Sequence, residues 1–313
     1  MSTDTRSASR MGTAPMGPLL FSLAIPMMVS MLFQALYNVV DSIFVSYINE
    51  AALSAVSLAF PIQNLMIAFA VGTGVGVNAY VSKSLGEGNR AEADRTAANG
   101  LFLALCTFVA FFVFGLVGVS AFMNSQTEDP LIRQYGNDYL SVCCIFSLGC
   151  MIQCMVEKLL SATGRSNYAM ITQLVGALTN IVLDPILIFG LFGFPRMEAA
   201  GAAAATVAGQ FLGAITGLYL NLRHNHDIQF RLQDFRPQGR TIRRIYQVGI
   251  PSIAMTSVGS VMTFCMNRIL IAFSSTAVAV CGVYFKMQSF IVMPLIGLNN
   301  GMVPIISYNY GAR

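Results

Sequence analysis

Long apolar stretches separated by short polar joints dominate the chain. A helix needs about 20 mainly apolar residues to cross a bilayer. Eight such spans can be drawn, at residues 17–40, 54–80, 97–122, 136–156, 168–192, 199–221, 247–273 and 277–305. The joints between the spans hold nearly all of the charged residues. This pattern predicts an all-α polytopic membrane protein with about eight transmembrane helices.

The composition excludes a soluble domain. The 313 residues are 55% hydrophobic and 10% charged, whereas a soluble domain carries about a quarter charged residues. The seven cysteines lie inside apolar runs and the two histidines lie together in a basic joint. We therefore expect the cysteines to act as small buried hydrophobes, and we expect no metal site and no cofactor.

The basic residues predict the orientation of the chain in the membrane. Fourteen of the 18 lysines and arginines lie in joints that would share one side with the N-terminus: Arg6, Arg10, Lys83, Arg90, Arg95, Lys158, Arg165, Arg223, Arg231, Arg236, Arg240, Arg243, Arg244 and Arg313. Cytoplasmic loops carry such an excess, so the N-terminus is predicted to be inside. The chain is predicted to cross the membrane several times. Anionic lipid is sufficient to explain the net charge of +4, and no nucleic-acid partner is expected.

A weak internal repeat predicts two lobes. A shift of 225 residues, the separation of Pro26 and Pro251, aligns residues that shape or pack the backbone. It places Ile25, Ala52, Phe60, Gln63, Gly72, Gly76, Ser82 and Gly86 on Ile250, Ala277, Phe285, Gln288, Gly297, Gly301, Ser307 and Gly311. Since six spans separate the copies, both begin on the same side of the membrane, which indicates a parallel repeat.

The repeat divides the chain into four parts. We predict a disordered polar tail at 1–15, a six-helix N-lobe at 16–222, a cytoplasmic linker at 223–246 and a partial C-lobe at 247–313. The second copy holds two spans where the first holds six. We therefore expect the chain to be a C-terminally truncated fragment of a longer protein.

The first span carries a polar stripe. Gln34, Asn38 and Asp41 follow the i, i+4, i+7 spacing of one helix face, and Tyr37 lies beside them. A carboxylate costs roughly 2.5 to 3.5 kcal/mol at the centre of a membrane helix, so such residues usually serve a function. One interpretation is a cavity-facing stripe on which Asp41 titrates. The alternative is that Asp41 ends the helix at the outer interface.

The fifth span carries a second carboxylate. Asn180 and Asp184 lie one helical turn apart, and Pro185 follows. A proline removes a backbone donor and leaves a carbonyl that can bind a cation or water. The alternative is that Asp184 caps a short helix that begins at Pro185. We favour an ion site, because Gln173 and Thr179 extend the polar face.

Other polar residues in the spans are less informative. Thr206 is the hydroxyl of the sixth span that can reach an ion. Gly72 and Gly76 form a GxxxG pattern that favours close helix packing, and the absence of a following Lys-Ser/Thr excludes a phosphate loop. Lys286 lies inside the last span, with a role that the sequence leaves open.

Several spaced motifs resemble the multidrug and toxic compound extrusion (MATE) family. They are LAIPMMVSMLFQALYNVVDSIFV (23–45), YVSKSLGEGN (80–89), LSATGRSNYAM (160–170), TNIVLDPILIFG (179–190) and GAAAATVAGQ (201–210). The segment 283–313 is similar to the branch that includes exporters of the DinF and MepA kind. The resemblance covers the chain from about Met16 onward.

The resemblance implies twelve helices in two six-helix lobes and export of cationic amphipathic drugs against inward H⁺ or Na⁺ flow. It places an ion-coupling site on Asp41, Asn180, Asp184 and Thr206, and a substrate cleft beside Gln34, Tyr37 and Asn38. Small drugs and membrane lipid are the expected partners, with no obligate protein partner. The last four helices of the family's plan are absent here.

These observations favour a secondary active antiporter over its rivals. A flippase of lipid-linked precursors would be expected to line its cavity with several cations, and this N-lobe shows none in mid-span. A non-transporting membrane scaffold would not need Asp41 or Asp184 to titrate. The chain has no zinc motif, Ser/His pair or phosphate loop, so we do not expect an enzyme.

Overall fold

A computed structural model of the chain describes residues 6–229, 237–271 and 275–312. Within them the chain is helical, with short turns between the helices. The helices are α1 (Arg6–Thr13), α2 (Met16–Ser46), α3 (Glu50–Gly86), α4 (Arg90–Val117), α5 (Val119–Gln126), α6 (Pro130–Ile145), α7 (Leu148–Ala162), α8 (Ser166–Phe189), the short 3₁₀ helix η1 (Leu191–Gly193), α9 (Glu198–His224), α10 (Gly239–Ile271) and α11 (Ser275–Gly311).

The predicted polytopic helical fold is confirmed. In the described residues, six helices are long and apolar enough to cross a membrane, and a seventh is added if α6 and α7 form one span. Those two helices meet at a bend of 48°, which the sequence pattern does not reveal. The predicted span 247–273 falls in α10, and some of its residues lie outside the described part.

Polar side chains begin several helices at the expected places. Asn49 accepts a hydrogen bond from the Ala52 backbone at 2.7 Å before α3, and Asn89 caps α4 in the same way. Asp129 accepts from the Leu131 backbone at 2.8 Å, with Pro130 in the first position of α6. These caps satisfy backbone donors that a helix start leaves free.

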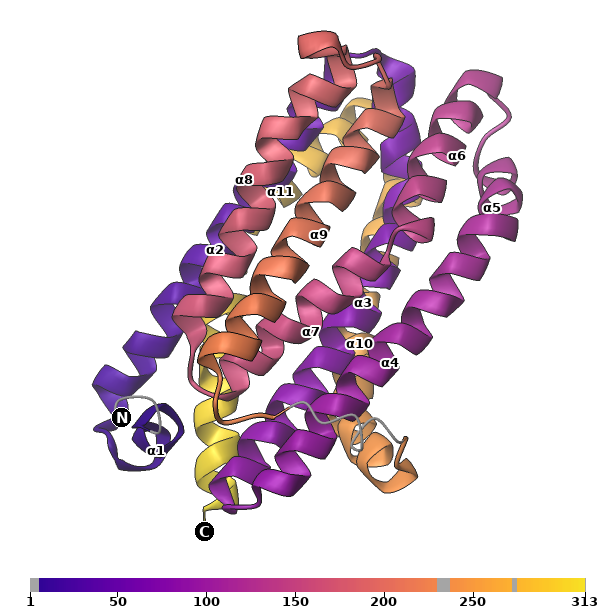
Figure 1. The fold of residues 1–313 in the computed structure, drawn as a ribbon. Helices are drawn as coiled ribbons and strands as arrows, with labels where there is room; N and C mark the ends of the chain where they lie inside the picture. Colours follow the sequence, from indigo (N-terminus) through magenta and orange to yellow (C-terminus); the bar gives the residue numbers. More distant parts are fainter. Residues whose placement is uncertain (1–5, 230–236, 272–274, 313) are drawn as a thin grey trace.

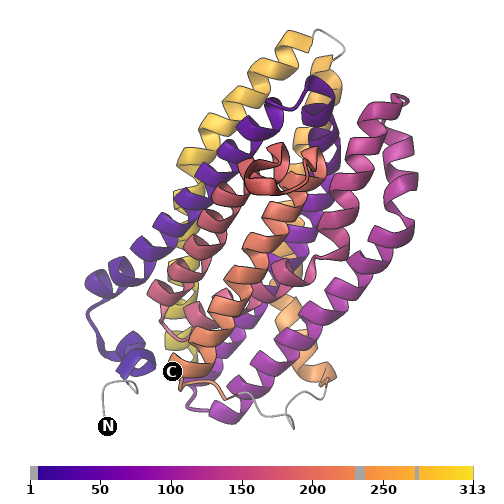
Figure 2. The same cartoon turned by 45° about the horizontal axis from the view of Figure 1, so that its top comes forward.

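Helix α1, the end of α11 and the start of α10 lie at one end of the bundle (Figures 1 and 2). We refer to it as the cytoplasmic end after the sequence prediction, which assigns the turns rich in lysine and arginine to the inside. Helices α10 and α11 pack on the outside of the remaining bundle, α10 along α3 and α11 along α2 (Figures 1 and 2). The boundaries of the two lobes stay a prediction.

Repeat-related glycines occupy matching places in these two helix contacts. A methyl group on Gly76 of α3 would lie 2.2 Å from the Ile245 carbonyl oxygen of α10. A methyl group on its repeat partner Gly301 of α11 would lie 2.7 Å from Cα of Ala24 in α2. Only glycine permits backbones to approach this closely.

The cytoplasmic ends of α3 and α11 cross each other reciprocally. A methyl group on Gly86 would lie 2.0 Å from the carbonyl oxygen of Tyr308, and one on Gly311 would lie 2.2 Å from that of Lys83. Gly86 and Gly311 are separated by the repeat shift, and so are Lys83 and Tyr308. The two copies therefore meet here about a local pseudo-twofold axis.

One basic residue is placed differently from the prediction. Lys158 was assigned to a cytoplasmic joint, but it lies inside α7 and is buried. Its Nζ donates to Oδ1 of Asn300 in α11 at 3.0 Å. The predicted span ended too early because its last turn contains the adjacent charges Glu157 and Lys158. The side chain of Lys286 lies outside the described residues.

Candidate functional site

The Asn180 side chain links two helices in the outer half of the bundle. It lies between Asp184, one turn further along α8, and Thr206 of α9, and all three are buried. The amide orientation that satisfies both ends donates to Oδ2 of Asp184 at 3.2 Å and accepts from Oγ1 of Thr206 at 3.1 Å. We adopt this orientation because hydrogen-bond networks decide amide orientation. The sequence prediction grouped these three residues, and the fold brings them together.

Asp184 lies inside a continuous helix. Helix α8 runs through Pro185 to Phe189, where Gly190 follows with a positive φ of 74°. Asp184 therefore does not cap a new helix at Pro185. Because proline has no backbone N–H, the carbonyl one turn before it lacks its usual helical donor.

Asp41 lies opposite this group on α2, which packs along α8. The helix continues past Asp41 to Ser46, so Asp41 does not end it. Its Oδ1 is buried without a hydrogen-bond partner among the described residues. The carboxylates of Asp41 and Asp184 are close enough for their charges to interact. A buried acid beside a half-buried one with an unsatisfied buried oxygen can hold a proton or a small cation.

Two tyrosines lie near Asp41. Tyr37 lies within electrostatic range of both carboxylates. Tyr139 of α6 is also within range of Asp41 and donates to Oε1 of Gln63 in α3 at 3.3 Å. The sequence prediction included Tyr37 but missed Tyr139. The sequence offered one indirect signal for Tyr139. Its hydrogen-bond partner Gln63 is a polar residue inside a span, and the internal repeat pairs it with Gln288.

The remaining predicted cleft residues do not join this cluster through any hydrogen bond in the described part of the chain. Gln34 is half-buried, whereas Asn38 is exposed on the outside of α2. A separate buried pair crosses between α7 and α8, where Gln153 donates to Gln173 at 3.3 Å. Gly213 of α9 provides the space for Gln153, since a methyl group there would lie 2.8 Å from its amide.

The residue types limit what this cluster can hold. In the described residues, no three His, Cys, Asp or Glu side chains are grouped as a metal site would require. Carboxylate, amide and hydroxyl oxygens favour hard cations rather than soft transition metals. A proton or an alkali cation fits these groups.

Comparison with known proteins identifies the family. The MatE family model matches residues 26–186 and 251–313. The chain belongs to the MatE family. The match includes residues of both repeat copies, and the gap between its two parts contains α9 with Thr206 as well as the predicted linker. The resemblance seen in the sequence motifs is thus confirmed.

The relatives carry different names. The chain is 27% identical over 291 residues to the multidrug export protein MepA of Staphylococcus haemolyticus, covering 92% of the chain and 63% of the relative. It is 24% identical to the FAD transporter of Shewanella oneidensis, covering 96% of the chain and 66% of the relative. The chain therefore spans less than two thirds of the length of these relatives.

Solved MATE structures share the fold. A MOP superfamily transporter from Pyrococcus furiosus matches with a TM-score of 0.91 and 26% identity, over 99% of this chain and 68% of that one. The outward-facing conformation of a multidrug resistance MATE family transporter matches with a TM-score of 0.88 and 27% identity, over 94% and 65%. Multi-pass membrane insertion follows from this fold and the apolar helices.

Proposed function

We propose that the protein containing this chain exports cationic amphipathic drugs in exchange for H⁺ or Na⁺. The single observation that carries the coupling proposal is the buried Asn180 bridge between Asp184 and Thr206, with an unpartnered oxygen of Asp41 nearby. The drug-export proposal draws on relatives that are named multidrug export proteins. The location proposed is the cytoplasmic membrane of a bacterial cell.

The proposed coupling uses the charge of the two acids. When Asp41 and Asp184 are ionised, the site attracts a cation, because buried like charges are stabilised by a counter-ion. Binding of H⁺ or Na⁺ removes that charge and with it the attraction for a cationic drug. The ion and the drug then oppose each other's binding, and by linkage the effect is reciprocal. Since the two acids interact, their titration belongs to the pair.

Efflux from vesicles tests this proposal. Asp41→Asn and Asp184→Asn variants of the full-length protein should lose ethidium efflux, while a Ser42→Ala variant beside Asp41 should retain it. Ser42 is a suitable control because its hydroxyl only returns to the Asn38 carbonyl of the same helix, at 2.8 Å. Undiminished efflux by both Asn variants would exclude coupling through these residues. Imposing a pH gradient or a Na⁺ gradient separately would identify the ion.

A second candidate function is export of an anionic flavin nucleotide. The FAD transporter of Shewanella oneidensis is a relative, and Lys158 places a buried ammonium between α7 and α11. A buried cation can attract an anionic substrate. Flavin export that persists in the Asp variants but is lost in Lys158→Met would favour this candidate.

A further inference from the structure

A cavity of about 490 Å³ lies at the cytoplasmic end, where α3 meets α10 and α11. Its floor includes the apolar side chains of Ala79, Val248 and Ile306. The rest of the lining is polar or aromatic and comprises Tyr80, Lys83, Glu87, Arg244, Gln247, Ser307 and Tyr310. The cavity therefore has an apolar side and a polar side, and residues of both repeat copies line it.

Two cations lie on the polar side, each next to a tyrosine ring. Nζ of Lys83 is 5.2 Å from the ring centre of Tyr310, and the guanidinium of Arg244 is 5.4 Å from that of Tyr80. Arg244 also donates a hydrogen bond to the Tyr80 hydroxyl. These contacts hold both cations at the cavity wall.

The acids near the cavity offset only part of this positive charge. Glu87 lies 3.7 Å from Nζ of Lys83 and is the acid that lines the cavity. Glu92 does not line the cavity; it accepts a hydrogen bond from the Tyr80 hydroxyl at 3.0 Å and is 3.9 Å from Arg95. With Lys83 and Arg244 opposing Glu87, the lining carries a net positive charge.

The pseudo-twofold axis relates this cavity to the place between α2 and α11 where the side chain of Met11 is packed. The repeat shift pairs Arg244, Val248, Tyr80 and Lys83 with Leu19, Leu23, Ile305 and Tyr308, in that order. Those four partners pack around Met11 of α1, which is 2% exposed. Asn309 fixes α1 there by donating to the Met11 carbonyl at 2.9 Å. One position is thus closed by an apolar side chain, whereas its counterpart is a cavity with cations in place of leucine and tyrosine.

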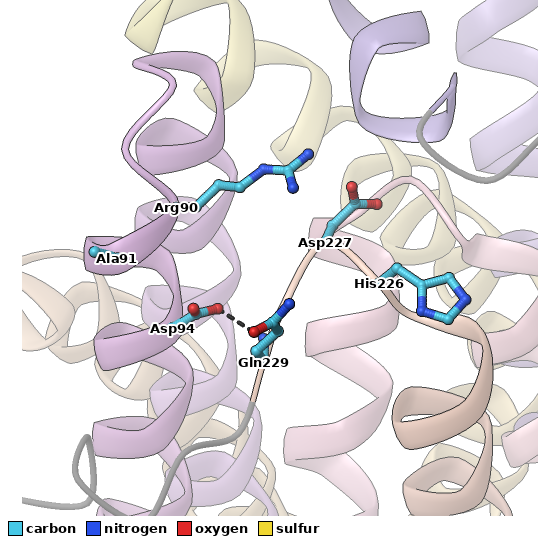
Figure 3. A pocket seen from close by; sticks show the side chains of 6 residues that line it. All are labelled: Arg90, Ala91, Asp94, His226, Asp227 and Gln229. Carbon is cyan, nitrogen blue, oxygen red and sulfur yellow. Dashed lines mark hydrogen bonds between the residues drawn. The ribbon is translucent and has the colours of Figure 1, made fainter. Parts of the chain in front are cut away.

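A second cavity at this end differs in charge. It has a volume of about 190 Å³ and is lined by Arg90, Ala91, Asp94, His226, Asp227 and Gln229 (Figure 3). Asp94 accepts from the Gln229 backbone at 2.8 Å (Figure 3), and Asp227 lies 3.4 Å from Arg165. With two acids beside Arg90, this smaller cavity does not favour an anion.

We propose that the cavity between α3, α10 and α11 binds the phosphate-bearing headgroup of an anionic phospholipid from the cytoplasmic leaflet. Basic pockets between helices at this depth suit such headgroups, and the volume lies in the range of small-molecule sites. Lys83 and Arg244 bind the phosphate, and the apolar side covers the glycerol and first acyl carbons. A free phosphate ion would use the cations but leave the apolar side exposed.

The bound lipid would connect the two repeat copies. Lys83 belongs to α3 and Arg244 to α10, so a phosphate between them bridges the copies. The same end contains the reciprocal crossing of Gly86 and Gly311. A ligand that binds only this arrangement stabilises it in proportion to its affinity. The lipid is therefore a stabiliser of the conformation in which the cytoplasmic ends of α3 and α11 touch.

Thermal unfolding of the full chain in neutral detergent tests the site. Dioctanoyl phosphatidylglycerol should raise Tm with a saturating dose response, whereas dioctanoyl phosphatidylcholine and inorganic phosphate should not. Lys83→Gln and Arg244→Gln should each weaken the apparent affinity about fivefold, and together about thirtyfold, as expected for two cations near a membrane surface. Arg223→Gln is the matched control, because Arg223 is an exposed cation at the same end outside the cavity.

Two results would overturn the proposal. Unchanged phosphatidylglycerol affinity in the double variant would remove the site. An equal rise in Tm with inorganic phosphate would remove the lipid as its ligand. Should Lys83→Gln fail to fold, Arg244→Gln alone decides the matter, since Arg244 is exposed. The phosphatidylglycerol affinity of Arg244→Gln must then fall, while that of Arg223→Gln must stay unchanged.

Discussion

Lys158 of α7 donates a hydrogen bond to Asn300 of α11 across the boundary between the repeat copies, at 3.0 Å. Both side chains are buried, with 4% and 9% exposure. The stem of Lys158 passes close to Gly74 of α3, where a methyl group would lie 2.8 Å from its Cγ. A buried ammonium with a neutral partner is costly to leave unpaired.

Removing the acceptor should therefore cost more than removing the amine. Asn300→Leu leaves the ammonium of Lys158 without this partner and should destabilise the protein by about 2 kcal/mol. Lys158→Met removes the charge together with its need for a partner, so it should cost less. Thermal unfolding in detergent measures both. The double variant should resemble Lys158→Met, as a double-mutant cycle would show. An Asn300→Leu variant that is as stable as Lys158→Met would contradict the assigned role.

The glycine crossing of α3 and α11 predicts a strong effect of small side chains. Gly86→Ala and Gly311→Ala place a methyl group 2.0 and 2.2 Å from backbone oxygens, so the helices must separate. Overpacking of this kind costs about 1–3 kcal/mol. Gly17→Ala is the control, since a methyl group there meets nothing within 4 Å. With the seven native cysteines replaced, alkylation of a cysteine placed at Ser307 should become faster in both crossing variants but not in the control. Equal rates in all three would show that the crossing does not limit access.

The sequence predicts the elements that depend on local pattern and misses those that depend on tertiary contact. The length of the apolar runs predicts the spans, and the spacing of the glycines predicts the repeat. In the fold, the repeat-related Gly86 and Gly311 lie at the crossing of α3 and α11. The bend between α6 and α7 has no such signal. Ser147, the residue before α7, makes no side-chain capping hydrogen bond, and the apolar run continues through the bend.

The candidate site shows the same division. Asn180 and Asp184 share one helix face, so their proximity follows from spacing alone. Thr206 joins them only because α8 and α9 pack together; the sequence identified it as a hydroxyl that can reach an ion, and only the family resemblance placed it with Asn180 and Asp184. Tyr139 was missed because it comes from α6, where a tyrosine in an apolar run is common. The burial of Lys158 was missed because a charge at the end of a span normally indicates water.

We predict that ion-driven efflux depends on the hydroxyl of Thr206. It donates to the Asn180 amide oxygen at 3.1 Å, and the Thr206 backbone N–H lies 3.2 Å from the same oxygen, so Thr206→Val removes one of its two donors. Loss of one buried hydrogen bond costs about 1 to 1.5 kcal/mol, and ion-driven ethidium efflux should fall about tenfold. Thr206→Ser retains the hydroxyl and should retain most of the activity. Equal activity of the Val and Ser variants would show that the hydroxyl has no part in coupling.

From the ion pair between Arg165 and Asp227 we predict that residues 225–229, just after α9, are firmly held against the bundle. The two groups are 3.4 Å apart, and their side chains are 6% and 2% exposed. Arg165 also donates to the carbonyl of His224. Removing one partner of a buried pair leaves an uncompensated charge and costs about 3–5 kcal/mol. Asp227→Asn should therefore lower the thermal unfolding temperature sharply.

An exposed ion pair provides the matched comparison. Arg196 and Glu198 are also 3.4 Å apart, but the Arg196 side chain is 60% exposed. Exposed pairs contribute about 0–1 kcal/mol, so Arg196→Gln should change the unfolding temperature little. Because the two pairs have the same separation, the difference between the variants measures the effect of burial. If Asp227→Asn were as stable as Arg196→Gln, the segment after α9 would not be held by this pair, and its other contacts would have to fix it.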